Sequence, residues 1–374
     1  MNRTTKRITA AAMRRLPKIL LHEHLDCSLR PATMLDLWSQ IGFDNAKLPF
    51  PEKVRTLWEA ASSLQNLSNR GHHVREAASP EQMAADAYQR YLARYARASL
   101  ANYVQAIVDH VLPLMQDAWH LYTVTQQRID DAVADGIIAA ELRFAPQLHT
   151  QDGMTLDGVM QAVIKASEEN AKIPVKWIIC CLRHEDAKMA RRLGDLALKH
   201  QEHVGAFDLA ADEELNPGVL DWWLEEALRV RRKSKGKIDL TIHLTETRKA
   251  TARDRKLIRD NNITRIGHGI KGDWSQYLEV CPTSNVVTGQ VASFAEHPID
   301  SFYRQGKLVT VNTDGTLFTR SDLTQEYLKL QRYHGWGHDQ FYIVNGWALQ
   351  ASSFDRPTKE RLLVLLNDGY DKAR

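Results

Sequence analysis

Eight short apolar runs, separated by amphipathic or polar stretches, constrain the fold of this chain more than any other feature of its sequence. The run over Val175–Leu182 is almost continuously apolar, which is typical of a strand covered on both faces of a parallel sheet. Leu156–Asn170 instead shows the 3.6-residue period of a helix with one apolar face. The predicted strands are Ile19–His24, Ile137–Phe144, Val175–Leu182, Val204–Leu209, Ile238–His243, Thr264–His268, Tyr277–Cys281 and Leu308–Asn312.

The repeated alternation of strand and helix predicts an α/β fold, a closed (β/α)8 TIM barrel. The alternative is an open, doubly wound sheet, which has about six strands and a phosphate-binding loop directly after the first of them. A G-x-G-x-x-G string does occur over residues 267–272, but it follows the sixth predicted strand. Its position therefore favours the barrel over a nicotinamide-dependent oxidoreductase.

The connection between the first two predicted strands, about residues 31–135, is far longer than an ordinary crossover. One polar part of it, Leu67–Ser79, is predicted to be a mobile loop. The rest has helical patterning, over Ala32–Ile41, Pro51–Leu64, Pro80–Tyr95 and Ser99–Ala134. We expect residues 1–374 to form a single domain, in which this helical insertion either covers the barrel mouth or packs at the periphery.

The composition limits the classes of partner. Lys and Arg number 49 and Asp and Glu 46, a net charge of +3, whereas a dedicated binder of nucleic acid or membrane surfaces concentrates basic charge. No apolar run approaches the roughly 20 residues that span a bilayer, and residues 1–18 lack the apolar core of a secretory signal. Four cysteines are too few for a disulfide scaffold. We expect a cytoplasmic protein whose partner is a small molecule, with its oligomeric state left open.

Four side chains of metal-binding type fall at the C-terminal ends of predicted strands. His22 and His24 share one face of the first strand, His243 ends the fifth, and Asp314 follows the eighth. These strand ends meet at one mouth of a barrel, where the first and eighth strands are neighbours. Taken singly, each histidine is more often a core residue and the aspartate a helix cap. Together they predict a site for one divalent metal ion such as zinc, with a position left for water.

Two further polar residues lie beside this predicted metal site. Glu246 comes three residues after His243, where a carboxylate can act as a general acid or base next to a metal-activated water. The alternative role for Glu246 is an acid in the first turn of a helix. His268 ends the sixth predicted strand and should point into the same mouth.

From about residue 18 to its C-terminus, the chain resembles the adenosine deaminase family of metal-dependent amidohydrolases. The motifs occur in the order of the family and include those around the residues already named. They are Leu21-His22-Glu23-His24-Leu25-Asp26, Glu141-Leu142-Arg143-Phe144-Ala145-Pro146, Cys180-Cys181-Leu182-Arg183-His184, Phe207-Asp208-Leu209-Ala210, His243 with Glu246, Arg265-Ile266-Gly267-His268-Gly269, Glu279-Val280-Cys281-Pro282-Thr283-Ser284-Asn285, Glu296-His297-Pro298-Ile299, Asn312-Thr313-Asp314 and Ala351-Ser352-Ser353-Phe354.

This resemblance implies a zinc-dependent hydrolase that releases ammonia from adenosine or a related aminopurine nucleoside. It implies that Glu246 transfers a proton to the purine ring nitrogen N1, that His268 orients the attacking nucleophile, and that Asp26 lies at the ribose end of the pocket. It also implies one zinc ion per chain, held by His22, His24, His243 and Asp314.

The sequence departs from the family pattern around the substrate. Gly315 replaces the second of two adjacent aspartates, a carboxylate that holds purine N7 in relatives. Cys27 and Ala211 replace glycines, the second of which usually lets the backbone approach the base. We expect Ala211 and Gly315 to be substrate-binding positions. We also expect Gly315 to open space beside the five-membered ring and adenosine to be a poor substrate.

These departures leave the substrate open. The alternatives are another aminated purine or heterocycle, such as adenine, an N6-substituted adenine or a nucleotide. A barrel that binds metal without catalysis is a further alternative, although such a protein has no need of Glu246 or His268.

Overall fold

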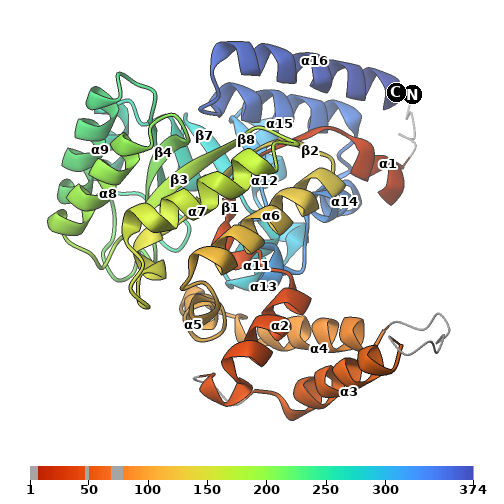
Figure 1. Cartoon of the computed structure of the whole chain (residues 1–374). Coiled ribbons are helices and arrows are strands. Elements are labelled where there is room, and N and C mark those ends of the chain that lie inside the picture. The colour runs from red at the N-terminus through yellow and green to blue at the C-terminus, as the bar shows by residue number, and fades with distance from the viewer. Residues whose placement is uncertain (1–6, 47–49, 69–78, 374) are drawn as a thin grey trace.

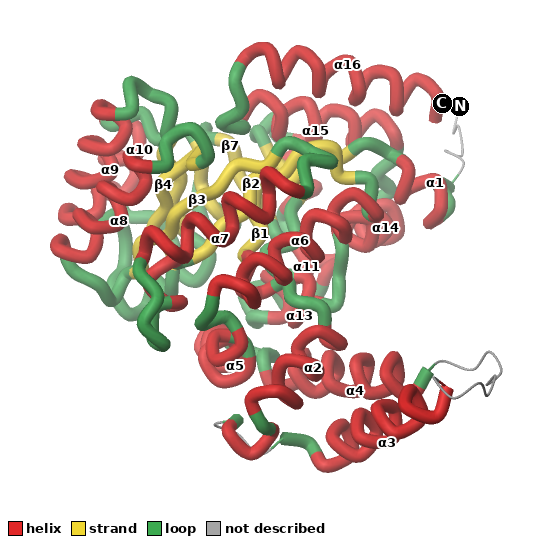
Figure 2. The backbone as a smooth tube through the Cα atoms, viewed as in Figure 1, coloured by secondary structure: helices red, strands yellow, loops and turns green. Residues whose placement is uncertain are grey.

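The computed structural model describes residues 7–46, 50–68 and 79–373. Within these ranges the core is one sheet of eight parallel strands, in which each strand pairs with the next along the chain (Figures 1 and 2). The strands are β1 Lys18–His24, β2 Ile137–Phe144, β3 Val175–Leu182, β4 Val204–Ala210, β5 Asp239–Leu244, β6 Arg265–His268, β7 Tyr277–Val280 and β8 Val309–Val311.

Backbone hydrogen bonds between β1 and the segment after β8 close the sheet. The N–H of His24 donates to the carbonyl of Asp314 at 2.7 Å, and the N–H of Asp314 donates to the carbonyl of His22 at 3.0 Å. Glu23 and Asp314 form the corresponding parallel bridge. The predicted (β/α)8 TIM barrel is thus confirmed, and its closure brings the first and last strands together beside the predicted metal-binding residues.

All eight predicted strands form, and their ends differ from the prediction by at most one residue, as in β5, predicted over Ile238–His243 and found over Asp239–Leu244. The strands are apolar because both faces of the sheet are covered. Every residue of β4, for example, is buried. One connection departs from the alternating pattern, because β6 and β7 are joined by a short loop in place of a helix.

Helices surround the barrel, and several of them begin at a side-chain cap. The carboxylate of Asp186 accepts the N–H of Met189 at the start of α8, and Thr251 and Asp254 form a capping box at the start of α10. None of the described helices is long and apolar enough to cross a membrane. Outside the insertion the helices are α1 Ala10–Arg15, α7 Leu156–Glu169, α8 Ala187–Lys199, α9 Asp221–Lys233, α10 Ala252–Asp260, α11 Pro282–Val287, α12 Ile299–Arg304, α13 Thr316–Thr319, α14 Leu323–His334, α15 His338–Ala351 and α16 Arg356–Ala373.

The long connection between β1 and β2 is helical, as predicted, except that Ser99–Ala134 is not one continuous helix. The chain leaves the helix around Pro113, which lacks a backbone N–H. It starts again at Asp117, whose carboxylate accepts the N–H groups of Trp119 and His120 at 2.8 Å. The helices of the connection are α2 Pro31–Ile41, α3 Glu52–Ser68, α4 Pro80–Tyr95, α5 Leu100–His110 and α6 Ala118–Ala134.

This helical insertion packs against segments at the barrel mouth (Figure 1). The side-chain amide of Gln89 donates to the carbonyl of Leu317, in α13 just after β8, at 3.2 Å. The N–H of Ala98 donates to the carbonyl of Val287, at the end of α11 after β7, at 2.9 Å. The insertion therefore contributes to the mouth. Most of the predicted mobile loop Leu67–Ser79 lies outside the described residues.

Candidate active site

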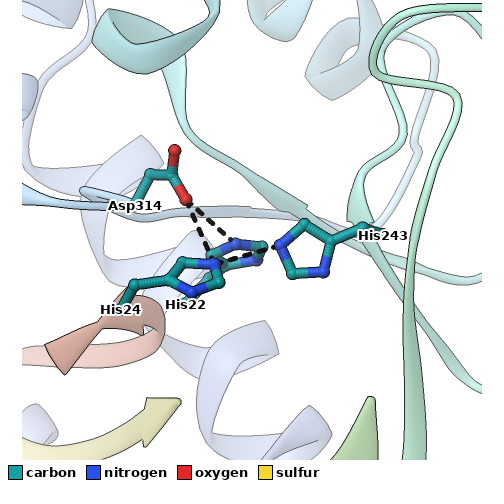
Figure 3. A group of neighbouring side chains, drawn as sticks. All are labelled: His22, His24, His243 and Asp314. Carbon is teal, nitrogen blue, oxygen red and sulfur yellow. Dashed lines mark hydrogen bonds and ion pairs between the residues drawn. The ribbon is translucent and has the colours of Figure 1, made fainter. Parts of the chain in front are cut away.

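Four of the predicted site residues meet at the C-terminal ends of the strands (Figure 3). His24 Nε2 lies 3.1 Å from His243 Nε2. Asp314 Oδ1 lies 3.3 Å from His22 Nε2 and 3.6 Å from His24 Nε2. One ligand atom from each of these residues lies within 4.8 Å of the other three, so the group is able to hold a metal ion.

Buried carboxylates hold two of these imidazoles from behind. Glu279 Oε2 lies 2.9 Å from His22 Nδ1, and Asp208 Oδ2 lies 2.9 Å from His243 Nδ1. The guanidinium of Arg143 bridges the two carboxylates, at 2.5 Å from Glu279 and 3.1 Å from Asp208. A carboxylate beside Nδ1 favours the tautomer with its proton on that nitrogen, so the Nε2 lone pairs face the centre of the group.

The charge state of the group also suits a cation. Burial lowers the pKa of both His24 and His243, which keeps these imidazoles neutral. Burial opposes ionisation of Asp314, but the nearby imidazoles of His22, His268 and His24 outweigh it, so the pKa of Asp314 lies well below its usual range. The hydroxyl of Ser284 donates to Asp314 Oδ2 at 2.6 Å, which leaves Oδ1 facing the histidines.

A relay of hydrogen bonds fixes the orientation of His268. The backbone N–H of Ile299 donates to His297 Nδ1 at 3.2 Å, so the proton of His297 lies on Nε2, which is 3.2 Å from Asn285 Oδ1. The amide nitrogen of Asn285 is then free to donate to His268 Nδ1 at 3.1 Å. Since Nδ1 accepts this bond, the proton of His268 lies on Nε2, which faces the site.

A second group of side chains, His22, His268, Cys281 and Asp314, satisfies the same distance condition for a metal. Two of its members are poor ligands in this state. Burial raises the pKa of the Cys281 thiol well above its usual value, which disfavours the thiolate. The Nε2 of His268 already carries a proton. The group with His24 and His243 is therefore the better metal site.

Glu246 is held at the site by the backbone around it. The carboxylate of Glu213 accepts the N–H groups of Thr245 and Glu246 at 2.9 Å and that of Thr247 at 3.2 Å. The ammonium of Lys271 donates to the carbonyl of Thr247 at 2.9 Å. These bonds fix the chain directly after β5, so the Glu246 side chain is positioned by a rigid loop.

The environment of Glu246 favours its protonated form. Burial raises its pKa well above the usual range, and the charges of Asp314 and Glu213 act in the same direction. One carboxyl oxygen, Oε2, lies 3.5 Å from His268 Nε2. The other, Oε1, is buried and has no hydrogen-bond partner among the described residues. A carboxylic acid in this state can give a proton to a bound ligand.

The three predicted substrate-binding residues, Asp26, Ala211 and Gly315, all lie near the metal group or beside a strand end. Asp26, in the 3-10 turn Leu25–Cys27, has its carboxylate 4.0 Å from His24 Nδ1 and 3.9 Å from His149 Nε2. Burial raises the pKa of Asp26 to about 7. Ala211 directly follows β4 and has φ +77°, a left-handed conformation that favours glycine.

The expectation that Gly315 opens space beside the ligand is wrong. A Cβ atom at this position would lie 2.3 Å from the Cβ of Cys27, 2.8 Å from the Cys27 carbonyl oxygen and 2.8 Å from the hydroxyl of Tyr103. The space of the missing side chain is therefore already filled. The sequence alone could not show this, because these residues come from three distant parts of the chain.

Some residues that shape the site gave no clear signal in the sequence. Glu213 lies in the loop after β4, and its contact with the loop after β5 depends on the conformation of both. Asn285 and His297 stood in motifs of the resemblance but had no predicted role. Tyr103 lies in the helical insertion, where a single tyrosine is usually a packing residue.

Comparison with known proteins identifies the family of this chain. A family model described as adenosine deaminase matches residues 73–368. The chain belongs to the adenosine deaminase family. An adenosine deaminase from Mycobacterium marinum is 30% identical to it, over 96% of this chain and 95% of that protein. The chain is thus a hydrolase that acts on carbon–nitrogen bonds in cyclic amidines.

Solved structures share the fold at lower sequence identity. The N6-methyl-AMP deaminase from Arabidopsis thaliana is 20% identical, with a TM-score of 0.74 over 97% of this chain and 100% of that one. An amidohydrolase from Burkholderia ambifaria, whose structure contains bound zinc, is 17% identical, with a TM-score of 0.71 over 99% of this chain and 96% of that one. At these identities the likeness shows the fold alone.

Proposed function

We propose that the protein is a zinc-dependent hydrolytic deaminase of adenosine or a related aminopurine nucleoside. The observation that best supports the proposal is that three imidazoles and a carboxylate able to hold a metal ion lie beside Glu246, a buried acid with a raised pKa. In that group His22 Nε2 is buried and has no hydrogen-bond partner in the described part of the chain. Such an orphaned nitrogen, next to two more imidazoles and a carboxylate, fits zinc.

In this proposal His22, His24, His243 and Asp314 hold one zinc ion per chain. Zinc, when bound, supplies a Lewis acid that lowers the pKa of water toward about 7. Glu246 gives its proton to the ring nitrogen beside the amino-bearing carbon, which makes that carbon open to addition of water. His268, through Nε2–H, orients the water oxygen. As the water adds, one of its protons passes to the amino group, and the carbon–nitrogen bond breaks with ammonia as the leaving group. The other proton of the water returns to Glu246 as the carbonyl forms.

The substrate class follows from the other end of the site. The resemblance implies that Asp26 lies at the ribose end of the pocket, and its buried carboxyl group favours sugar hydroxyls over a negatively charged phosphate. The relative from M. marinum is an adenosine deaminase, whereas the fold neighbour from A. thaliana is named for a methylated nucleotide. Asp26 therefore supports a nucleoside as the substrate of this chain.

The test combines metal analysis with release of ammonia from adenosine, adenine and AMP, and of methylamine from N6-methyladenosine. We expect about one zinc ion per chain and turnover of a nucleoside. His243→Ala should lose the metal, because it removes one of the ligands. Glu246→Gln should keep the metal and lose about 10²–10⁴-fold in turnover, the usual contribution of a general acid–base group.

Two results would contradict the proposal. Full activity of a protein free of divalent metal would exclude the metal mechanism. Normal zinc content without ammonia release from any aminopurine would indicate a metal-binding barrel without this catalysis. A control substitution on the far helices, Gly346→Ala in α15, should change neither metal content nor turnover, because a Cβ atom there meets nothing within 4 Å.

A further inference from the structure

Cys27, Gly315 and Tyr103 fill one side of the site together. Gly315 has φ −168°, an extended conformation that any residue adopts, so glycine is required there by space and not by the backbone. The space is taken by Cys27 from the turn after β1 and by Tyr103 from α5 of the insertion. The resemblance implies a carboxylate at this position in relatives, whereas this chain has a thiol and a phenol beside it.

The hydroxyl of Tyr103 is the unusual member of this cluster. The residue is 3% exposed, and within the described ranges its oxygen has no hydrogen-bond partner stronger than the adjacent Cys27 thiol. Its ring packs edge-on against Phe318 at 4.9 Å between centroids, which fixes the direction of the hydroxyl. The neighbouring polar group is the Cys27 thiol, a weak partner. Buried hydroxyls nearly always have a hydrogen-bond partner, so we expect a bound ligand to supply one for the Tyr103 hydroxyl.

The position of Tyr103 indicates which edge of a ligand it meets. Its hydroxyl lies beside Gly315, on the side of the mouth formed by β1 and β8. Glu246 follows β5, on the opposite side of the barrel. In a 6-aminopurine the reacting carbon has N1 on one side and, across C5, N7 on the other. If Glu246 protonates N1, the edge toward Tyr103 carries N7, an acceptor of hydrogen bonds.

We propose that Tyr103 is a specificity-determining residue whose hydroxyl donates a hydrogen bond to N7 of the purine. The inference rests on the proposed function and extends it, because it makes a residue of the helical insertion responsible for recognition of the five-membered ring. Burial raises the pKa of the phenol well above its usual value. The hydroxyl therefore stays neutral and keeps its proton for donation, whereas a carboxylate must first be protonated to do so.

The test uses two pairs of compounds that differ only at N7: adenosine with 7-deazaadenosine, and adenine with 7-deazaadenine. Binding is measured in the Glu246→Gln background, where turnover is slowed by about 10²–10⁴-fold, over times too short for either compound to be consumed. The kcat/KM is measured with Glu246 present. With Tyr103 we expect the purine to be preferred over its 7-deaza partner by about 5- to 100-fold, the effect of leaving one buried polar group unpaired. Tyr103→Phe should reduce that preference to about 3-fold or less.

A matched control separates recognition from structure. Tyr95→Phe removes another hydroxyl of the insertion, which donates to Asp109 at 3.4 Å, and should leave the N7 preference unchanged. Equal losses on both members of a pair in Tyr103→Phe, or an N7 preference that survives it, would overturn the inference. Failure of the proposed function looks different, since wild-type protein would then release ammonia from no aminopurine at all.

Discussion

Gly315→Ala should destabilise the protein, although it adds only one methyl group. The added Cβ atom would lie 2.3 Å from the Cβ of Cys27 and 2.8 Å from both the Cys27 carbonyl oxygen and the Tyr103 hydroxyl. A separation of 2.3 Å is far inside van der Waals contact, so one side must move. Overpacking of this kind costs about 1–3 kcal/mol, and the loss of glycine freedom in the unfolded chain returns about 0.4–1 kcal/mol. Because a separation of 2.3 Å calls for the upper end of the overpacking range, about 3 kcal/mol, we expect a net loss of about 2 kcal/mol.

Cys27→Gly should rescue part of this loss. It removes the 2.3 Å contact but leaves the backbone and phenol contacts at 2.8 Å. In the Cys27→Gly background, Gly315→Ala should therefore cost about 1 kcal/mol, a coupling of about 1 kcal/mol between the two positions. The coupling is the cost of Gly315→Ala in wild type minus its cost in the Cys27→Gly background. The stability lost through the cavity that Cys27→Gly itself creates is present in both members of the second pair and therefore cancels.

The assay is urea unfolding of metal-free protein, so that effects on metal affinity through Asp314 do not enter. The urea concentration at the midpoint of unfolding is compared among variants whose free energy of unfolding has the same dependence on urea concentration. Gly346→Ala is the control, since it adds a methyl group in open space inside α15 and should stabilise by up to about 1 kcal/mol. The reasoning fails if Gly315→Ala is as harmless as Gly346→Ala, or if its cost is unchanged by Cys27→Gly.

Two further predictions test the support of the site and the base of the barrel. Asp208→Asn should weaken zinc binding by about 10- to 100-fold, measured by competition with a chelator, because it weakens the hold on His243. Lys18, whose ammonium donates to the carbonyls of Leu16 and Asp135, has a pKa lowered by burial from 10.5 to about 8. Between pH values of about 8 and 10.5, Lys18 is more protonated in the unfolded chain than in the folded one. The free energy of unfolding of wild type, relative to that of Lys18→Met, should therefore rise by up to about 3 kcal/mol as pH is raised from about 7 to about 11. A difference that stays constant or falls would contradict this.

The sequence was sufficient to predict the barrel and the position of the metal group. Strands such as Val175–Leu182 are buried on both faces, so their apolar runs are unmistakable and their ends lie close to the prediction. His22, His24, His243 and Asp314 could be placed together because the ends of parallel barrel strands meet by topology. Neither step requires knowledge of a side-chain conformation.

What the sequence could not predict depends on contacts between loops. The break between α5 and α6 needed the cap at Asp117 to be seen in place. The two departures at Cys27 and Gly315 looked independent in the sequence, yet they are one feature of the structure. Only the closure of the barrel, with the bridge between Glu23 and Asp314, brings the turn after β1 against the segment after β8.

The residues of the site come from two kinds of segment, the strand ends of the barrel and the helical insertion. The metal group and Glu246 sit on or directly after strands, where carboxylates and backbone bonds fix them from behind. Tyr103 comes from the helical insertion, which touches the mouth but supplies none of the proposed metal ligands. On the proposal made for Tyr103, we therefore expect a substitution there to alter which ring is recognised while the metal group keeps its geometry. In the family pattern a second aspartate follows Asp314, whereas here Cys27 and Tyr103 fill its place, so one negative charge beside Asp314 is missing. The pKa of Glu246 is therefore set mainly by burial and by the charges of Asp314 and Glu213. Recognition of the ring can thus change with little effect on the protonation of the acid.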